Sequence, residues 1–260
     1  MSDGTGTLEI LRILVMGNSH VAALMDATRH GAAAEFGLAP SFAALGGSMF
    51  RALYAEDGRL RIREDVARGP QLDRFRAMKM ENFDLSSVDV IYIYSSSFVN
   101  VQEFIHVPLT LRLEEGRWFS RSFAIDCLRD YVRTRRLVAF AETFVAESGG
   151  RPVVICHPPF RTREHSKLEG VDVPQDWRDA LLAACDECFA RPGLATMLQP
   201  KETIEEVAFT FRSFTDGCTT LDGAVRDRGI ESHMNAAYGR LWLRDAARLA
   251  RRLAPRAEAA

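Results

Sequence analysis

Ile10-Leu-Arg-Ile-Leu-Val-Met16 is a mostly apolar run that ends in Gly17 and Asn18. A run of this length, closed by two residues that favour turns, is typical of a buried central strand. From Ser19 onward, apolar residues recur at helical spacing, which predicts a helix with Ser19 as its N-cap. Strand, turn and helix in this order are typical of the first unit of an α/β fold.

Strand-like and helix-like segments continue to alternate along the chain. Strands are expected at residues 41–45, 88–94, 152–156 and 194–198, and helices at about 124–147, at 177–189 and along the apolar stripe from Tyr238 to Leu253. Strands separated by helices predict an α/β fold with a mostly parallel sheet of about five strands, covered on both faces. We expect one domain over residues 1–260.

Two segments do not fit the alternating pattern. Residues 51–82 are charged and are interrupted by Gly58, Gly69 and Pro70, so they are expected to form an insertion with some helix. Residues 98–123 are expected to form a second, lid-like insertion. The Ala- and Arg-rich residues 254–260 are expected to fray.

Composition limits the classes of function. The chain has 260 residues, a formal net charge of −2, 47% hydrophobic and 26% charged residues. This balance excludes wholesale disorder and lacks the basic footprint of a general nucleic-acid binder. No apolar run reaches the roughly 18 residues of a membrane span, and the first apolar stretch lacks the flanks of a signal peptide.

The cysteine pattern bears on the cellular location of the protein, and the absence of nucleotide-binding motifs limits the cofactors that it can use. The five cysteines have no framework spacing, which favours a reducing, cytoplasmic location. Cys185 and Cys188 form a C-x-x-C, but they lie in a helical pattern, so a buried helix face is favoured over a metal or redox site. Neither a dinucleotide fingerprint nor a P-loop follows the first strand. No metal and no cofactor are therefore expected.

The candidate catalytic and binding residues are those just after the strands, because open α/β sheets bind ligands beyond the carboxyl ends of their strands. Ser19 has two interpretations there. It caps the helix, or it is a nucleophile whose oxyanion intermediate is stabilised by the N–H groups at the helix N-terminus. A nucleophilic serine needs a base, and His233, just before the last helix, can return to this edge. A third possibility is that the helix N-terminus binds a phosphate or nucleotide.

These residues carry a resemblance to a known family. Val15-Met-Gly-Asn-Ser-His20, the pair Gly46-Gly47 and His233-Met-Asn-Ala-Ala-Tyr-Gly239 together resemble the SGNH hydrolase (GDSL-like) superfamily, in particular bacterial members associated with polysaccharide modification. The resemblance implies a flavodoxin-like three-layer α/β/α sandwich and ester chemistry on small esters or acylated carbohydrates. It also implies that Ser19 is the nucleophile and His233 the base, with the Ser19 N–H and Gly47 or Gly46 as oxyanion donors.

The chain departs from the family pattern at two places. Where the family has a G-x-N-D turn, this chain has Ser95-Ser-Ser-Phe-Val-Asn100, so Asn100 is the expected oxyanion donor, with Ser97 as the alternative. The family aspartate three residues before the histidine is replaced by Ile230. Glu231 is the expected orienting acid, because residues two apart in an extended segment face the same side. Asp227 and Asp216 are more distant candidates.

Four further residues are expected to bind substrate: Asn18, His20, His157 and Arg161. For the last two, the alternative is a proline-fixed loop with solvated arginines. The sequence therefore predicts a cytoplasmic serine esterase or O-acyltransferase with a small-molecule or glycan ester substrate. It predicts no nucleic-acid partner and no transmembrane segment. The competing hypothesis is a non-catalytic SGNH-like module that binds a glycan or assists polysaccharide synthesis.

Overall fold

The computed structural model describes residues 9–66, 69–94, 120–134, 137–165, 174–225 and 233–254. Its central sheet has five parallel strands, β2 (Leu38–Ala44), β1 (Leu11–Gly17), β5 (Val90–Tyr94), β6 (Val153–Cys156) and β7 (Leu194–Met197), in that spatial order. If these five strands are renumbered 1 to 5 along the chain, their spatial order is 2-1-3-4-5, which is the order of flavodoxin-like folds. The predicted α/β sandwich is confirmed.

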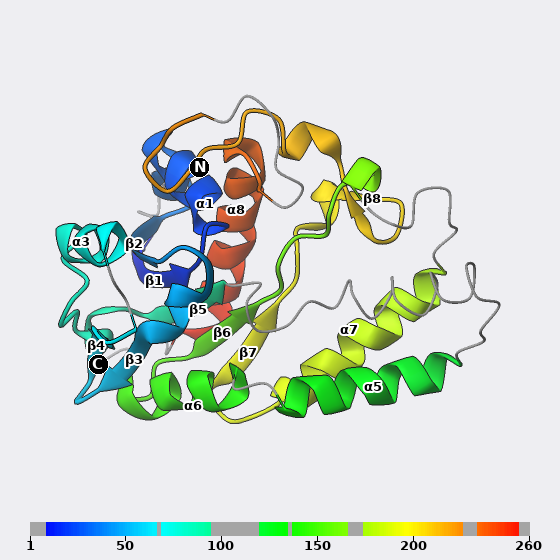
Figure 1. Ribbon diagram of the computed structural model, residues 1–260, viewed down its shortest axis with the longest axis horizontal. Helices are drawn as coiled ribbons and strands as arrows, with labels where there is room; N and C mark the ends of the chain where they lie inside the picture. Colours follow the sequence, from blue (N-terminus) through cyan, green and yellow to red (C-terminus); the bar gives the residue numbers. More distant parts are fainter. Residues whose placement is uncertain are drawn as a thin grey trace, which may run out of the picture.

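Helices cover both faces of the sheet (Figure 1). On one face lie α1 (Val21–Arg29), α2 (Ala32–Glu35) and α8 (Ala236–Leu253), and on the other lie α5 (Arg121–Thr134), α6 (Leu137–Glu147) and α7 (Gln175–Phe189). Successive side chains of a strand point to opposite faces of the sheet, so each strand packs against both layers of helices. Leu14 and Met16 pack with α6, whereas Ile13 and Val15 pack with α1 and α8.

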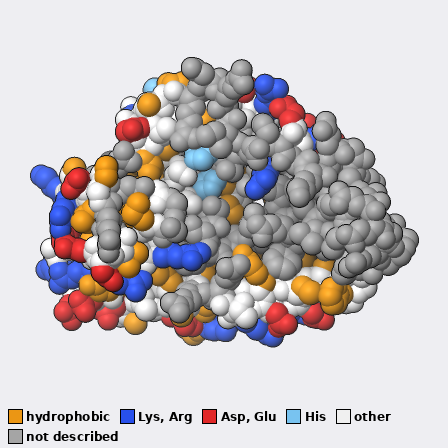
Figure 2. Space-filling view, viewed as in Figure 1, with side chains coloured by type: hydrophobic (Ala, Val, Ile, Leu, Met, Phe, Trp, Pro, Cys, Tyr) orange, Lys and Arg blue, Asp and Glu red, His pale blue; other side chains and the backbone are white. Residues whose placement is uncertain are grey.

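The predicted insertion at 51–82 contains more strand than its composition indicated. A hairpin joins β3 (Leu53–Glu56) and β4 (Arg59–Ile62), and α3 spans Pro70–Ala77. The turn residues Asp57 and Gly58 both have positive φ, as a two-residue hairpin turn requires. Lys and Arg side chains intermix with Asp and Glu side chains on this side of the molecule (Figure 2), in keeping with the near-zero net charge.

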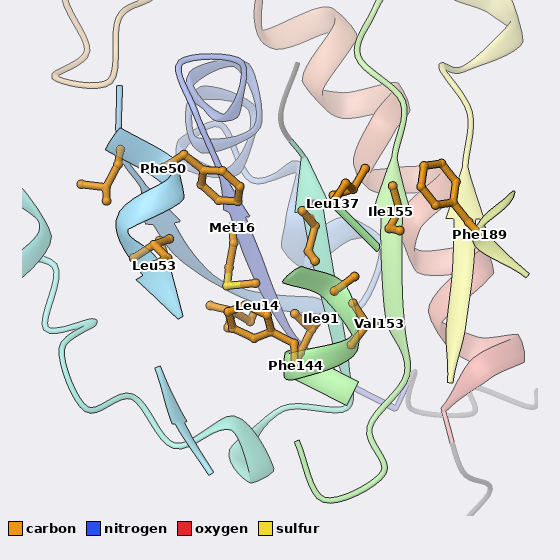
Figure 3. Close-up of a cluster of buried hydrophobic side chains, with 14 of the residues drawn as sticks. Leu14, Met16, Phe50, Leu53, Ile91, Leu137, Phe144, Val153, Ile155 and Phe189 are labelled. Atoms are coloured by element: carbon orange, nitrogen blue, oxygen red, sulfur yellow. The ribbon is translucent and has the colours of Figure 1, made fainter. Parts of the chain in front are cut away.

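The core on the α5–α7 face reaches from the hairpin to β7. Figure 3 shows Phe50 and Leu53 beside Met16, and Phe144 beneath Ile91. All five of these side chains are at most 1% exposed. Burying one such side chain contributes about 1.5–3 kcal/mol, so this layer fixes the insertion on the sheet.

The remaining elements are short. They are η1 (Gly47–Ala52), η2 (Leu85–Ser87), η3 (Arg163–His165), η4 (Lys201–Thr203), η5 (Arg212–Phe214), β8 (Ile204–Glu205) and β9 (Phe209–Thr210). The expected long helix at 124–147 is described as α5 and α6, one on each side of residues 135–136. Most of the expected lid, residues 98–119, lies outside the described residues, as do residues 255–260 of the expected tail. No helix among the described residues has the length and apolarity to cross a membrane.

Candidate functional site

The strand order changes direction between β1 and β5, because the chain goes from β1 to β2 on one side and later to β5 on the other. In flavodoxin-like sheets, ligands bind in the crevice beyond the carboxyl ends of the strands at this point. The residues directly after β1 are Asn18, Ser19 and His20. The fold therefore places the predicted nucleophile at the position where such sheets bind ligands.

Gly17 brings the turn after β1 close to both neighbouring strands. A Cβ at this position would lie 2.1 Å from the Tyr94 carbonyl oxygen and 2.5 Å from Val21 Cγ2. On the other side, the Leu45 N–H donates to the Gly17 carbonyl at 3.0 Å. The sequence indicated a turn glycine here, and the structure shows that close packing against β5 requires it.

The prediction that Ser19 is the N-cap of the first helix is wrong. Helix α1 begins at Val21, its cap residue is His20, and no side chain caps it. Asn18 Oδ1 accepts a hydrogen bond from the His20 N–H at 3.2 Å, which stabilises the turn. Ser19 is partly exposed, and its Oγ makes no hydrogen bond to another described residue. The hydroxyl group is therefore not used in a capping role.

His20 and His233 come together from opposite ends of the chain. Their rings stack with centroids 5.6 Å apart and planes inclined by 21°. The His20 ring also lies 5.9 Å from the ring of Tyr94, the last residue of β5. His20 is only 5% exposed, and its ring lies against the rings of Tyr94 and His233. Figure 2 shows histidine side chains at the surface near the middle of one face.

Asn235 fixes the segment that carries His233. Its Oδ1 caps α8 by accepting from the Tyr238 N–H at 3.2 Å. Its Nδ2 donates to the carbonyls of Ser213 and Asp216 at 2.8 and 2.9 Å. The Asn235 side chain, two residues after His233, thus joins the start of α8 to the loop around η5. The carboxylate of Asp216 is turned to Arg212, 3.7 Å away.

Replacing Asn235 with alanine is expected to lower the free energy of unfolding by about 1–2 kcal/mol, since the cap and two further hydrogen bonds are lost. Urea denaturation measures the change. Asn235→Asp retains an oxygen that can cap α8 but loses both amide donors, so its stability should lie between those of alanine and wild type. If both variants are as stable as wild type, Asn235 does not fix this segment.

Two other residues of the C-terminal motif are packing residues. The Tyr238 side chain is fully buried, and its hydroxyl lies 3.3 Å from the Tyr94 hydroxyl, which donates to it. Burial raises the pKa of the Tyr94 phenol well above its usual value, so it stays protonated at neutral pH. A Cβ on Gly239 would lie 2.1 Å from the Ala23 carbonyl oxygen, so α8 crosses α1 at close range. Neither role is evident from the sequence motif.

The turn after β2 lies beside the turn after β1, since the Leu45 N–H bonds to Gly17. Gly46 follows in an extended conformation, with φ −68° and ψ 144°, and η1 begins at Gly47. Both expected oxyanion-hole glycines are thus on the same sheet edge as Ser19. Asn100 and Glu231, as well as the alternatives Ser97 and Asp227, lie outside the described residues.

The structure places His157 and Arg161 away from Ser19. His157 directly follows β6, which is two strands from β1, and its ring faces α7. Its Nε2 lies 3.5 Å from Asp186 Oδ1, and the side chain is 6% exposed. Arg161 is exposed, and its carbonyl accepts from the Thr210 N–H at 3.0 Å. Of the four expected substrate-binding residues, only Asn18 and His20 adjoin Ser19.

Within the described residues, no group of three or more His, Cys, Asp or Glu side chains is arranged to hold a metal ion. Cys185, in the C-x-x-C, lies on the buried face of α7, as its helical spacing indicated. Burial raises the pKa of the Cys185 thiol far above its usual value, which removes thiolate reactivity at neutral pH.

No protein-family model matches the sequence, and no curated protein matches it. Among solved structures, the chain is similar to the periplasmic domain of a lipopolysaccharide acetyltransferase from Salmonella ser. Paratyphi A, with 12% identity, a TM-score of 0.43 and coverage of 92% of this chain and 84% of that one. A proposed arylesterase from Agrobacterium tumefaciens has 15% identity, a TM-score of 0.40 and coverages of 94% and 100%.

A salicylyl-acyltransferase from a tetracycline biosynthetic pathway is similar at 12% identity and a TM-score of 0.37. The match covers 95% of this chain but 55% of that one. These similar structures are thus acyl-transfer and esterase-like proteins. Likenesses at this identity and TM-score assign neither an activity nor a substrate to this chain.

Proposed function

We propose that this protein is a serine esterase or O-acyltransferase of the SGNH type, which acts on a small ester or an acylated carbohydrate. Ser19 is the nucleophile and His233 the base. The observation that supports the proposal is the stacking of His233 on His20, the residue next to Ser19, with ring centroids 5.6 Å apart. This contact brings His233, which lies just before the last helix, close to the turn after β1 that contains Ser19.

The reaction has two steps. His233 accepts the proton of the Ser19 hydroxyl while Oγ attacks the ester carbonyl, and the tetrahedral oxyanion accepts hydrogen bonds from the N–H groups of Ser19 and of Gly47 or Gly46. The alcohol leaves with the proton from His233. A water or a sugar hydroxyl then gives its proton to His233 and attacks the acyl group, which releases Ser19.

Other parts of the proposal concern supporting groups and location. Glu231 orients the His233 ring, and Asn100 supplies a further oxyanion donor. The chemistry uses no metal or cofactor. The cysteines at positions 127, 156, 185, 188 and 218 are free thiols, which supports a reducing cytoplasm as the location.

A fluorophosphonate probe and aryl acetate hydrolysis test the proposal on the wild-type protein. The probe phosphonylates a serine, with loss of fluoride, only where a base activates it, so we expect one covalent adduct, which peptide mapping places on Ser19. We also expect the aryl acetate to be cleaved. Absence of both adduct and hydrolysis would exclude the esterase mechanism.

The exchange His233→Gln is expected to lower kcat by about a thousandfold or more, because glutamine cannot accept the serine proton. His30→Gln is the matched control, because the His30 side chain is 73% exposed. Equal activity of the His233 and His30 variants would contradict the role of His233.

A second candidate function is a non-catalytic glycan-binding or accessory protein. The observation that favours it is that Ser19 Oγ makes no hydrogen bond to His233, although both residues are described. Catalytic hydrogen bonds are often long without substrate and tighten in the complex. The two candidates are distinguished by Ser19→Ala, which leaves an accessory function unchanged.

A further inference from the structure

A concave region lies along the same edge of the sheet, beyond the carboxyl ends of β6 and β7. It is a pocket of about 610 Å³ between these strand ends and the N-terminal half of α7. This volume is typical of small-molecule sites. Neighbouring parallel strands are about 4.8 Å apart, so the pocket lies roughly 10–15 Å from Ser19, two to three strands from β1.

The wall of the pocket is preorganised by Gln199, which is 5% exposed. Its Oε1 accepts from the Phe160 N–H at 2.8 Å, and its Nε2 donates to the hydroxyls of Thr203 and Thr210 at 2.8 and 2.9 Å. The side chain therefore joins the loops after β6 and β7 to β9. Because these bonds fix its position, the wall has a defined shape before any ligand enters.

Polar groups on α7 form one side of the pocket. Arg178 donates to Asp179 Oδ1 through Nε and Nη2 at 3.1 and 2.9 Å, and through Nη1 to the Val207 carbonyl at 3.0 Å. Gln175 Nε2 donates to both oxygens of Asp179 at 2.9 and 3.0 Å. The hydrogen bonds from Gln175 and Arg178 lower the pKa of Asp179, so the carboxylate is charged at neutral pH.

The charged side chains that line the pocket have no net charge. Arg178 and Lys201 are balanced by Asp179 and Glu206 among the described lining residues. Arg178 is already bonded to a carboxylate, and Glu206 forms an ion pair with Arg163. A phosphorylated ligand needs surplus positive charge, which this pocket does not offer. An acyl chain would pack on the apolar lining but would leave the polar groups of Arg178, Asp179 and Lys201 facing hydrocarbon, which costs free energy.

Apolar side chains form the rest of the lining: Pro158, Phe160, Leu182, Leu198 and Ile204. Leu198 is 40% exposed, so its apolar surface is accessible to a ligand. An uncharged ligand with many hydroxyl groups and apolar C–H faces matches both sides. Its hydroxyls pair with the donors and acceptors on α7 and Lys201, and its C–H face packs on the leucines.

We propose that this pocket binds a neutral sugar unit. The inference deepens the proposed function and rests on it in one respect: the sugar held here belongs to the substrate whose ester group reaches Ser19. The separation of the two places then implies a substrate, or an acyl acceptor, that contains more than one sugar ring. Sugar binding by the pocket itself does not require that Ser19 is catalytic.

Saturation-transfer NMR on the full chain tests the binding. The probes are glucose, galactose, mannose, N-acetylglucosamine, maltose and cellobiose, with glucose 6-phosphate and decanoate as competing classes. We expect at least one neutral saccharide to bind with a Kd of about 1 mM or lower. Binding by none of the six, or binding only by the phosphate or the fatty acid, would overturn the proposal.

Two pairs of variants locate the binding. Leu198→Trp fills the pocket and is expected to weaken saccharide binding at least about tenfold, whereas Ile10→Trp, at a residue 66% exposed just before β1, leaves it unchanged. Lys201→Met removes one donor and is expected to weaken binding severalfold, with Lys79→Met as the matched control. If Leu198→Trp binds the saccharide as well as wild type, the sugar is held elsewhere and the proposal is wrong.

The same titration separates this inference from the proposed function. Ser19→Ala should bind the saccharide with the Kd of the wild type. Binding that persists in a protein without esterase activity would leave the sugar pocket in place and contradict only the proposed reaction. Esterase activity without saccharide binding would contradict only the pocket.

Discussion

Ser19→Ala is expected to lower the hydrolysis of aryl acetates by at least about a thousandfold, and to abolish labelling by a fluorophosphonate. Alanine removes the oxygen that we propose attacks the ester. Because Ser19 Oγ makes no hydrogen bond to a described residue, its removal should leave the free energy of unfolding nearly unchanged. Steady-state kinetics and urea denaturation measure the two effects.

The matched control is Ser122→Ala. Ser122 is exposed at the start of α5, and among the described residues its Oγ bonds only to Ser120 Oγ, at 2.9 Å. Its activity and labelling should equal those of the wild type. If Ser19→Ala retains full activity, or if the label maps to another serine, the assignment of the nucleophile is wrong, and the accessory function becomes the better interpretation.

Gly239→Ala is expected to have the largest effect on stability, about 3 kcal/mol or more. The new Cβ would lie 2.1 Å from the Ala23 carbonyl oxygen and 2.9 Å from Ala27 Cβ. Backbone cannot rotate away as a side chain can, so α8 would have to move from α1. Overpacking of this kind usually costs about 1–3 kcal/mol, and here it exceeds the roughly 1 kcal/mol that alanine gains over glycine in a helix.

Urea denaturation measures this loss as a lower midpoint at an unchanged slope. We also expect reduced esterase activity in the folded fraction, since α8 positions His233. Ala237→Leu, an enlargement at an exposed position of the same helix, should change the free energy of unfolding by less than about 0.5 kcal/mol. A Gly239→Ala protein as stable as wild type would show that the two helices separate at no cost.

The sequence was sufficient to predict the fold class, the number of sheet strands and the approximate position of each. Apolar runs such as the one before Gly17, and the stripe from Tyr238 to Leu253, are local patterns that reflect burial directly. The hairpin around Asp57 and Gly58 was missed, although the Asp-Gly pair is a strong hairpin signal. Its strands are short and charged, so they were interpreted as part of an insertion.

The site could be predicted only in part. Two short motifs indicated Ser19 and His233, but local pattern assigned Ser19 to a cap that the structure does not use. Capping depends on the backbone angles of a single turn, and this turn directly follows Gly17, which packs against the Tyr94 carbonyl. That contact joins residues far apart in the sequence, so no local pattern contains it.

By itself, then, the sequence determined which residues are buried and which segments become strands or helices, because hydrophobic burial and backbone propensity act over a few residues. Only the tertiary structure decided that His233 stacks on His20 and that His157 faces α7. It likewise decided that Gln199 fixes the wall of the pocket beyond β6 and β7. Each of these depends on strand order and on helices that cross at close range, as α1 and α8 do at Gly239. Such contacts follow from the packing of the whole chain.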